Sequence, residues 1–268
     1  MPDFPLFGNY IPGTSPLHRI DPRAKLLLAL GLILVMFVAR TFVALGMCAL
    51  FAAVLVGLSG IRPTAVLRSI VPLLFIVVVT ALINLFFIQG GDVIASLGPA
   101  TISERGLYSC AFFSVRLTLL LLCMSLLTLT TTNLDITEGF EALLKRFKRF
   151  GVPAHELGMM MGIALRFLPQ FVFEAQTVYR AQISRGAEFA GGVGKGRLRS
   201  LSSLIVPLFT SAFRHAETLS CAMEARCYHG DAGRTRLSPL AYSALDAYGA
   251  LALAIMLACV IAANLIPW

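Results

Sequence analysis

Five long apolar runs dominate the chain, and any fold that it adopts must hide them from water. They cover residues 26–39, 42–58, 70–88, 107–131 and 240–266. A helix needs about 20 residues to cross the hydrocarbon of a bilayer, and the last three runs reach that length. Charged residues make up only 13% of the chain, about half of their usual share in a soluble domain. The sequence therefore predicts an all-α, polytopic membrane protein with about five transmembrane helices.

The first two runs decide the topology, because both are short. One arrangement is a pair of spans with Arg40 between them, and a short pair of this kind could also form a re-entrant hairpin. The alternative is one helix over 26–58 with Arg40 near mid-membrane. A central arginine costs roughly 2.5–3.5 kcal/mol on insertion scales, and the single helix also moves the basic N-terminal residues outside. The positive-inside rule therefore selects five spans with a cytoplasmic N-terminus. We expect a cytoplasmic segment 1–25, four transmembrane helices within 26–132 and a fifth within 238–268.

The section 133–237 breaks the membrane pattern, and we predict that it is a cytoplasmic domain of long helices. Residues 133–236 hold 14 of the 22 Lys and Arg residues, and such a concentration of positive charge favours the cytoplasmic side. Helical spacing of apolar residues predicts helices over about 136–149, 154–185 and 198–226. Pro169 and Pro207 lie inside the last two, and Pro169 predicts a kink or a break.

The first of these helices is amphipathic. Asp135 is placed as its N-cap, with Glu138 three residues later, as in a capping box. Basic residues fill its last turn, where they complement the helix dipole. Such a helix either lies on the membrane surface or packs its apolar face on its own domain.

The other two helices have similar ends. One ends in Ser184-Arg185-Gly186 and the other in Ala225-Arg226-Cys227, and each arginine follows an alanine by four residues. Gly186 suits the left-handed position that follows a helix, so the first helix is expected to stop there. Cys227 suits that position poorly, and the second helix is expected to continue to Gly230.

Nothing in the sequence predicts a catalytic, metal or cofactor site. Gly194-Lys195 resembles part of a P-loop, but Phe189 stands where the first glycine belongs and Gly196 where Ser or Thr belongs. The six cysteines show no metal-ligand spacing and are expected to be free thiols. Arg116, inside the fourth apolar run, is a functional candidate by its depth, or else an arginine that faces a helix interface or snorkels outward.

The chain resembles the transmembrane T component of energy-coupling factor transporters, which import vitamins and metal ions in bacteria and archaea. The two arginine endings resemble the paired Ala-Arg-Gly signatures of that family, with Ser184 and Cys227 as departures from it. The segment 10–26, with Asp21-Pro22-Arg23-Ala24-Lys25, is similar to the family's N-terminal segment. Arg166-Phe167-Leu168-Pro169 is similar to its mid-domain motif. The similarity covers essentially the whole chain.

The resemblance implies a non-catalytic coupling subunit in a bacterial or archaeal cell membrane. Its partners would be two cytoplasmic ABC-type ATPases, a membrane-embedded, substrate-binding S component and the lipid bilayer, without nucleic acid. Residues 133–237 would be the coupling domain, and the two arginine endings would dock on the ATPases. An integral membrane enzyme and a self-contained secondary transporter are the alternatives. Neither the acidic metal cluster of the first nor the broken mid-membrane helices of the second is visible in the sequence.

Overall fold

The protein forms two compact units in a computed structural model, which describes residues 10–88, 90, 93–97, 100–151, 153–187, 195–230 and 240–265. The first unit comprises Met1–Leu143 and Leu240–Trp268, and the second comprises Leu144–Pro239. The second unit is thus inserted, in sequence, between two parts of the first. Each unit is described separately below.

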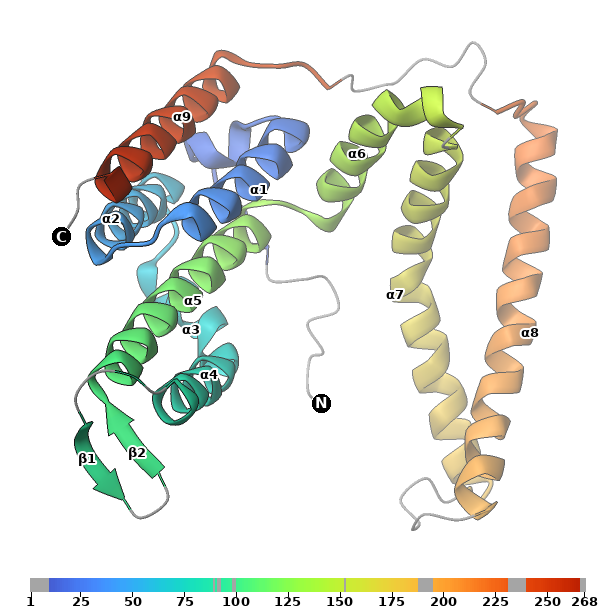
Figure 1. The fold of residues 1–268 in the computed structure, drawn as a ribbon. Helices are drawn as coiled ribbons and strands as arrows, with labels where there is room; N and C mark the ends of the chain where they lie inside the picture. Colours follow the sequence, from blue (N-terminus) through green and yellow to red (C-terminus); the bar gives the residue numbers. More distant parts are fainter. Residues whose placement is uncertain are drawn as a thin grey trace. The chain divides into compact units, whose positions relative to one another are not determined.

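The first unit is a bundle of helices (Figure 1). Its elements are η1 (Pro16–Arg19), α1 (Pro22–Val38), α2 (Phe42–Ser59), α3 (Pro63–Ile70), η2 (Val71–Leu73), α4 (Leu74–Phe87), α5 (Glu104–Thr130), α6 (Asn133–Leu144) and α9 (Ala244–Leu265). The predicted all-α class is confirmed. A short antiparallel hairpin of β1 (Val93–Leu97) and β2 (Ala100–Ser103) joins α4 to α5 and was not predicted.

The first two apolar runs form two helices, as expected, and not one long helix. Arg40 lies exposed in the turn between α1 and α2. Thr41 caps α2, because its hydroxyl accepts the backbone N–H of Ala44 at 3.2 Å. The basic residue therefore lies at a helix end, where the merged helix would have buried it at mid-span.

Two side chains of α9 fasten it parallel to α1. At the start of both helices, the Asp246 carboxylate accepts the backbone N–H of Asp21 at 2.9 Å. At the other end, Asn264 donates to the Val38 carbonyl at 2.8 Å and accepts from the Arg40 backbone N–H at 3.0 Å. Both helices therefore run in the same direction over their whole length.

The helix α5 runs antiparallel to α1, and side chain to backbone hydrogen bonds join the two helices near both ends of α1. Arg116 donates to the carbonyl of Ala39, the C-cap of α1, and its guanidinium lies 4.6 Å from the centroid of the Phe112 ring. Lys25 donates to the Thr130 carbonyl at 2.8 Å. Of the readings open for Arg116, the structure supports the one that places it at a helix interface.

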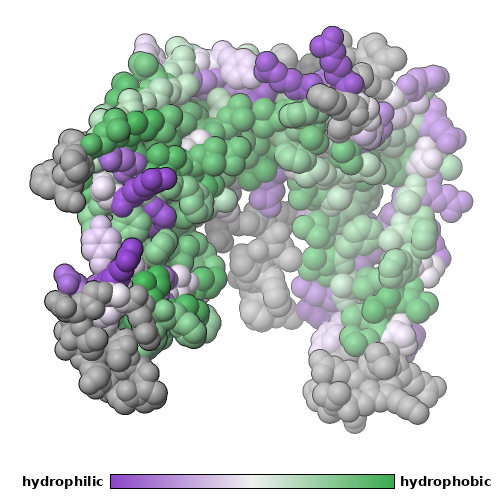
Figure 2. Space-filling view, viewed as in Figure 1, coloured by the Kyte–Doolittle hydropathy of each residue, from purple (hydrophilic) through white to green (hydrophobic). Residues whose placement is uncertain are grey.

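Five helical segments of the described chain are long and apolar enough to cross a membrane, namely α2, α3–α4, α5, α7 (Ala154–Ser184) and α9. This set differs from the expected one in two members. The 17-residue α1 is absent from it, and α7, which we expected outside the membrane, is included. Figure 2 shows hydrophobic residues over much of the visible surface of the first unit, as a lipid-exposed bundle requires.

The helix α6 differs from its predicted form at both ends. Thr132 caps it, because the Thr132 hydroxyl accepts the backbone N–H of Asp135 at 3.1 Å, so the cap assigned to Asp135 was wrong. The α-helix ends at Leu144 and continues as a 3-10 helix, η3 (Lys145–Phe150). Gly139 is buried against Pro22 of α1, where an added Cβ would lie 3.1 Å from the Pro22 carbonyl. At this residue α6 packs on α1 of the first unit and not on the predicted coupling domain.

The second unit contains η3, α7 and α8 (Lys195–Ala225). Both long helices have 31 residues, and both continue without a break through their prolines, Pro169 and Pro207. A break at Pro169, one of the two outcomes predicted for it, does not occur. Each of the two helices is therefore continuous from its first residue to its last.

The contact of α4 with the start of α5 gives a test of the first unit. A Cβ added to Gly106 would lie 2.7 Å from the Ile88 carbonyl oxygen and 2.9 Å from that of Leu85. Backbone atoms cannot rotate away, so we expect Gly106→Ala to destabilise the protein by about 1–3 kcal/mol. The midpoint of thermal unfolding in detergent, followed by circular dichroism, should fall. Gly46→Ala in α2 is the control, since nothing lies within 4 Å of its added Cβ. It should leave the midpoint unchanged or raise it slightly, and equal effects of the two substitutions would contradict this packing.

Candidate functional site

The candidate site consists of the two arginine-bearing ends of the pair α7 and α8. These helices pack antiparallel, because residues late in one meet residues early in the other (Figure 1). His155, near the start of α7, lies 3.3 Å from the hydroxyl of Tyr228, just past the end of α8. Nearer the middle, Glu174 of α7 accepts a hydrogen bond from Ser211 of α8 at 2.7 Å.

The end of α7 is a Schellman motif with Arg185 at the C-cap. The N–H of Gly186 donates to the carbonyl of Ile183 at 2.9 Å, and the N–H of Ala187 donates to that of Gln182 at 2.9 Å. Gly186 has a φ of +83°, the left-handed conformation that this motif requires. The expectation that the helix stops at Gly186 is confirmed. Ser184, where the family signature has alanine, adds a hydrogen bond to the Arg180 carbonyl at 3.1 Å.

The end of α8 repeats this motif with Arg226 at the C-cap. The N–H of Cys227 donates to the carbonyl of Glu224 at 2.9 Å, and the N–H of Tyr228 donates to that of Met223 at 3.1 Å. Cys227 takes the left-handed position with a φ of +53°, and it is the one non-glycine residue with positive φ in the described chain. The prediction that α8 continues to Gly230 was therefore wrong. Two backbone hydrogen bonds compensate the cost of a left-handed cysteine, roughly 1–2 kcal/mol.

The two arginines are thus equivalent in position and lie at opposite ends of the helix pair. A helix of 31 residues is about 46 Å long, which sets the scale of their separation. Both side chains are exposed, and neither guanidinium makes a hydrogen bond or ion pair within the described residues. The last carbonyls of each helix are occupied by the backbone of the motif. The guanidinium donors therefore remain available to a partner at each end.

A polar cluster at the middle of the pair was not predicted from the sequence. His215 lies 2.6 Å from one oxygen of Glu174, and Ser211 donates to the other at 2.7 Å. Gln170 joins them, with its amide 3.3 Å from Glu174 and 3.2 Å from His215. The only sequence signal of this cluster is the i,i+4 spacing of Gln170 with Glu174 and of Ser211 with His215. This spacing places each pair on one helix face.

This cluster does not have the geometry of a hydrolytic triad. In a triad, the two ring nitrogens of the histidine face the serine and the carboxylate separately. Here Nε2 of His215 faces both, at 3.4 Å from Ser211 and 2.6 Å from Glu174. The cluster fastens the two helices together at their midpoint. His215 therefore has its partner, Glu174, on the other helix of the pair.

The cysteines, possible metal ligands and the glycine-rich segment are the other features that the sequence analysis considered. All six cysteines are free, as expected, with Cys48 and Cys123 buried. Among the described residues, no three His, Cys, Asp or Glu side chains converge as metal ligands. The glycine-rich residues 191–194 lie outside the described part of the chain, so the P-loop comparison there remains a matter of sequence.

The left-handed cysteine makes a testable difference between the two ends. Cys227→Gly should relieve backbone strain and slow hydrogen exchange of the Tyr228 amide by about threefold to tenfold. The reciprocal variant, Gly186→Cys, should speed exchange of the Ala187 amide by a similar factor. Amide exchange of the purified protein, read by mass spectrometry of peptides that cover each end, measures both. Unchanged exchange in both variants would show that the residue at this position does not limit opening of the helix end.

Comparison with known proteins identifies the family of the chain. The model of the CbiQ family, described as cobalt transport protein, matches residues 13–237. A protein of Thermosediminibacter oceani named energy-coupling factor transporter transmembrane protein EcfT is 46% identical over 239 residues, which are 89% of this chain and 90% of the relative. Proteins of the same name from Acidaminococcus fermentans and Bacillus subtilis are 40% and 38% identical, over 97% and 92% of this chain and 96% and 93% of their own lengths. The chain therefore belongs to the CbiQ family, as the transmembrane T component of an energy-coupling factor transporter.

Proposed function

We propose that this subunit transmits ATP-driven motion from two cytoplasmic ATPases to a separate S component, which binds the vitamin or metal ion to be imported. The subunit itself is non-catalytic, and its partners hydrolyse ATP. The observation that carries the proposal is the pair of matched helix ends, each with an exposed, unpaired arginine at the same position of the same capping motif.

The spacing of the two ends supports two docking partners. Arg185 and Arg226 lie at opposite ends of rods of about 46 Å, so one small contact surface cannot receive both. An arginine presents a planar fork of donors to carboxylates or carbonyls, and such charge-assisted hydrogen bonds are strong and directional. Two similar ATPase subunits, each receiving one arginine, fit this arrangement. Motion of either subunit would then act on the end of a stiff helix.

Apolar side chains on the same helices supply contact area for a membrane-embedded partner. Phe173 of α7 is 71% exposed and Phe213 of α8 is 72% exposed. An exposed apolar surface of this kind marks a site that meets protein or lipid. We assign it to contact with the S component at the cytoplasmic face of the membrane.

The parallel arrangement of α1 and α9 supports a cytoplasmic location of the helix pair. Asp246 joins the starts of these helices and Asn264 their ends. If the predicted span over α1 crosses the membrane, it therefore crosses in the same direction as α9. The chain between them must then cross an odd number of times, and α2, α3–α4 and α5 make three crossings. A fourth crossing by α7 alone would place the starts of α1 and α9 on opposite sides. The helix α8 is not among the described helices that are long and apolar enough to cross, so we infer that the section 133–237 remains on one side. Residues 133–236 hold 14 of the 22 Lys and Arg residues, which favours the cytoplasm as that side.

Charge reversal at the helix ends tests the coupling role. We expect Arg185→Glu with Arg226→Glu to reduce copurification of the ATPases and substrate uptake at least tenfold, since the loss of a buried charged contact costs about 2–5 kcal/mol. Each single variant should have a smaller effect. The matched control is Arg180→Glu with Arg214→Glu, which makes the same change of charge at exposed positions on the same two helices. Full uptake and full copurification in the first double variant would refute the assignment, and equal losses in both would indicate a nonspecific charge effect.

Cysteine labelling tests the orientation. In a background without the other cysteines, a single Cys227, exposed just past α8, should resist a membrane-impermeant maleimide in intact cells. A cysteine at Arg105, exposed at the start of α5, should react. Permeabilised cells should label both, which controls for reactivity. The reverse pattern in intact cells would invert the protein and separate the helix pair from ATP.

A further inference from the structure

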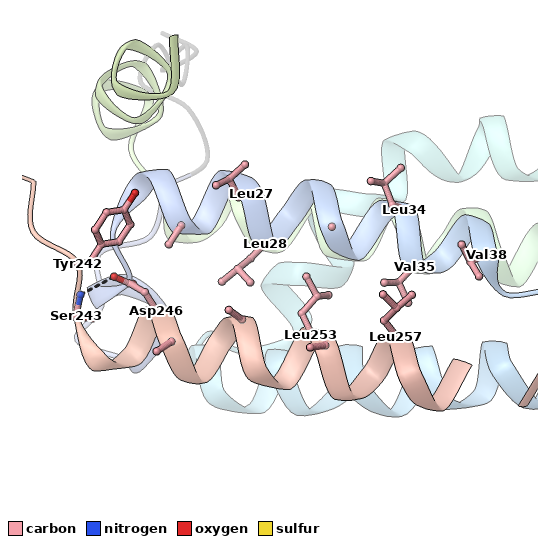
Figure 3. Close-up of a pocket in the computed structure, with 15 residues that line it drawn as sticks. Leu27, Leu28, Leu34, Val35, Val38, Tyr242, Ser243, Asp246, Leu253 and Leu257 are labelled. Atoms are coloured by element: carbon pink, nitrogen blue, oxygen red, sulfur yellow. Dashed lines mark hydrogen bonds between the residues drawn. The ribbon is translucent and has the colours of Figure 1, made fainter. Parts of the chain in front are cut away.

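An apolar groove of about 870 Å³ runs along the seam between α1 and α9 (Figure 3). Its rims on α1 are Leu27, Leu34 and Val38, which are 52%, 57% and 41% exposed. On α9 it is lined by small residues, Ala247, Ala250 and Ala254. The groove extends from Ala24 to Val38 on α1, which corresponds to about 21 Å of helix.

Close helix contact beneath the groove explains its depth. A Cβ added to Gly31 would lie 2.6 Å from Leu253, and one added to Gly249 would lie 2.8 Å from Leu28. The two helices therefore approach closely at these glycines. The alanines beside them leave the outer part of the seam unfilled. Such a channel suits a thin, flexible apolar chain.

One end of the groove is lined by Tyr242 and Asp246, and the half-buried Arg23 lies beside it. Arg23 lies over the ring of Tyr242, 5.8 Å from its centroid, and Tyr242 lines this end. Nε of Arg23 is buried and has no hydrogen-bond partner within the described residues. Asp246 also lines this end, but its two oxygens accept backbone N–H groups of Asp21 at 2.9 Å and Ser243 at 2.7 Å. The carboxylate therefore does not pair with Arg23.

We propose that this groove is a binding site for an anionic phospholipid, with an acyl chain between α1 and α9 and the phosphate on Arg23. A buried cationic donor without a partner favours an anion, and a phosphate accepts the planar fork of an arginine well. One leaflet holds about 15 Å of hydrocarbon, half of the whole core. An acyl chain that starts at Arg23 therefore stays within the groove over its full depth in the leaflet. The site requires only that α1 and α9 cross the membrane, and it is independent of the coupling role.

The orientation proposed above places the polar end of the groove in the cytoplasmic leaflet, where anionic lipids attract basic residues near the surface. A transmembrane helix of a partner protein is the competing occupant. An unpaired arginine at the end of the groove favours the lipid, because a helix that enters the seam brings an apolar surface to this charge. The two occupants are distinguished below.

Native mass spectrometry of the full-length chain in detergent, titrated with phosphatidylglycerol or phosphatidylcholine, tests the site. The wild type should retain one phosphatidylglycerol with about tenfold preference over phosphatidylcholine. Arg23→Met should abolish this preference. The matched control Arg19→Met, an exposed arginine just before α1, should keep it. Ala250→Phe fills the groove from an exposed position without a change of charge, and it should weaken binding of both lipids.

Two results would overturn the proposal. One is an unchanged preference in Arg23→Met, and the other is unchanged binding in Ala250→Phe while Arg23→Met loses it, which would indicate a surface charge effect without a groove. A photoreactive phenylalanine analogue at position 250, activated in intact cells, identifies the occupant. A mass increase of one phospholipid supports the proposal, and a crosslink to a membrane protein assigns the groove to a partner. Circular dichroism of each variant excludes loss of fold as the cause.

Discussion

The first unit depends on the hydrogen bonds that join α9 to both ends of α1. Bilayers offer no water to unpaired backbone groups, so the ends of transmembrane helices need partners from the protein. Asp246 and Asn264 supply them at the two ends of α1, across more than two hundred residues of sequence. The same contacts fix the direction of α9. They also return the chain, after the inserted second unit, to the membrane side from which it left, because α5 ends beside Lys25 and α9 begins beside Asp21.

The second unit holds two equivalent arginines at opposite ends of a pair of long helices. The Schellman motifs occupy the terminal carbonyls with backbone N–H groups, so the arginine side chains are not drawn back onto their own helices. The polar cluster around Glu174 joins the rods at their middle. Rigidity and availability are thus provided by different residues, the first by Glu174, Ser211 and His215, and the second by the residues after each arginine.

The sequence predicted well whatever depends on local apolar pattern and missed what depends on pairing between distant segments. The apolar runs predicted α1, α2, α3–α4, α5 and α9 of the first unit and the break at Arg40. The two arginine endings predicted equivalent helix ends. The low preference of cysteine for the left-handed conformation led to the wrong prediction that α8 continues past Cys227, because two backbone hydrogen bonds outweigh this modest conformational cost. The partner of His215 could not be read from the sequence, since it depends on the register of α7 against α8. Asp135 was taken as a cap because its carboxylate suits one, whereas Thr132, three residues earlier, makes the contact.

The equal length of α7 and α8, 31 residues each, has a consequence for how such subunits can diverge. Each residue of an α-helix turns the chain by about 100°. One residue inserted between the central polar cluster and a terminal arginine would therefore rotate that arginine by about 100° around the helix axis. It would move the arginine along the axis by only about 1.5 Å. The number of residues between Glu174 and Arg185, or between His215 and Arg226, therefore determines the direction in which each arginine points relative to the polar cluster. An insertion or deletion in either segment changes the direction in which the arginine points. In the docking arrangement proposed above, compensation requires a matching rotation of the partner's surface.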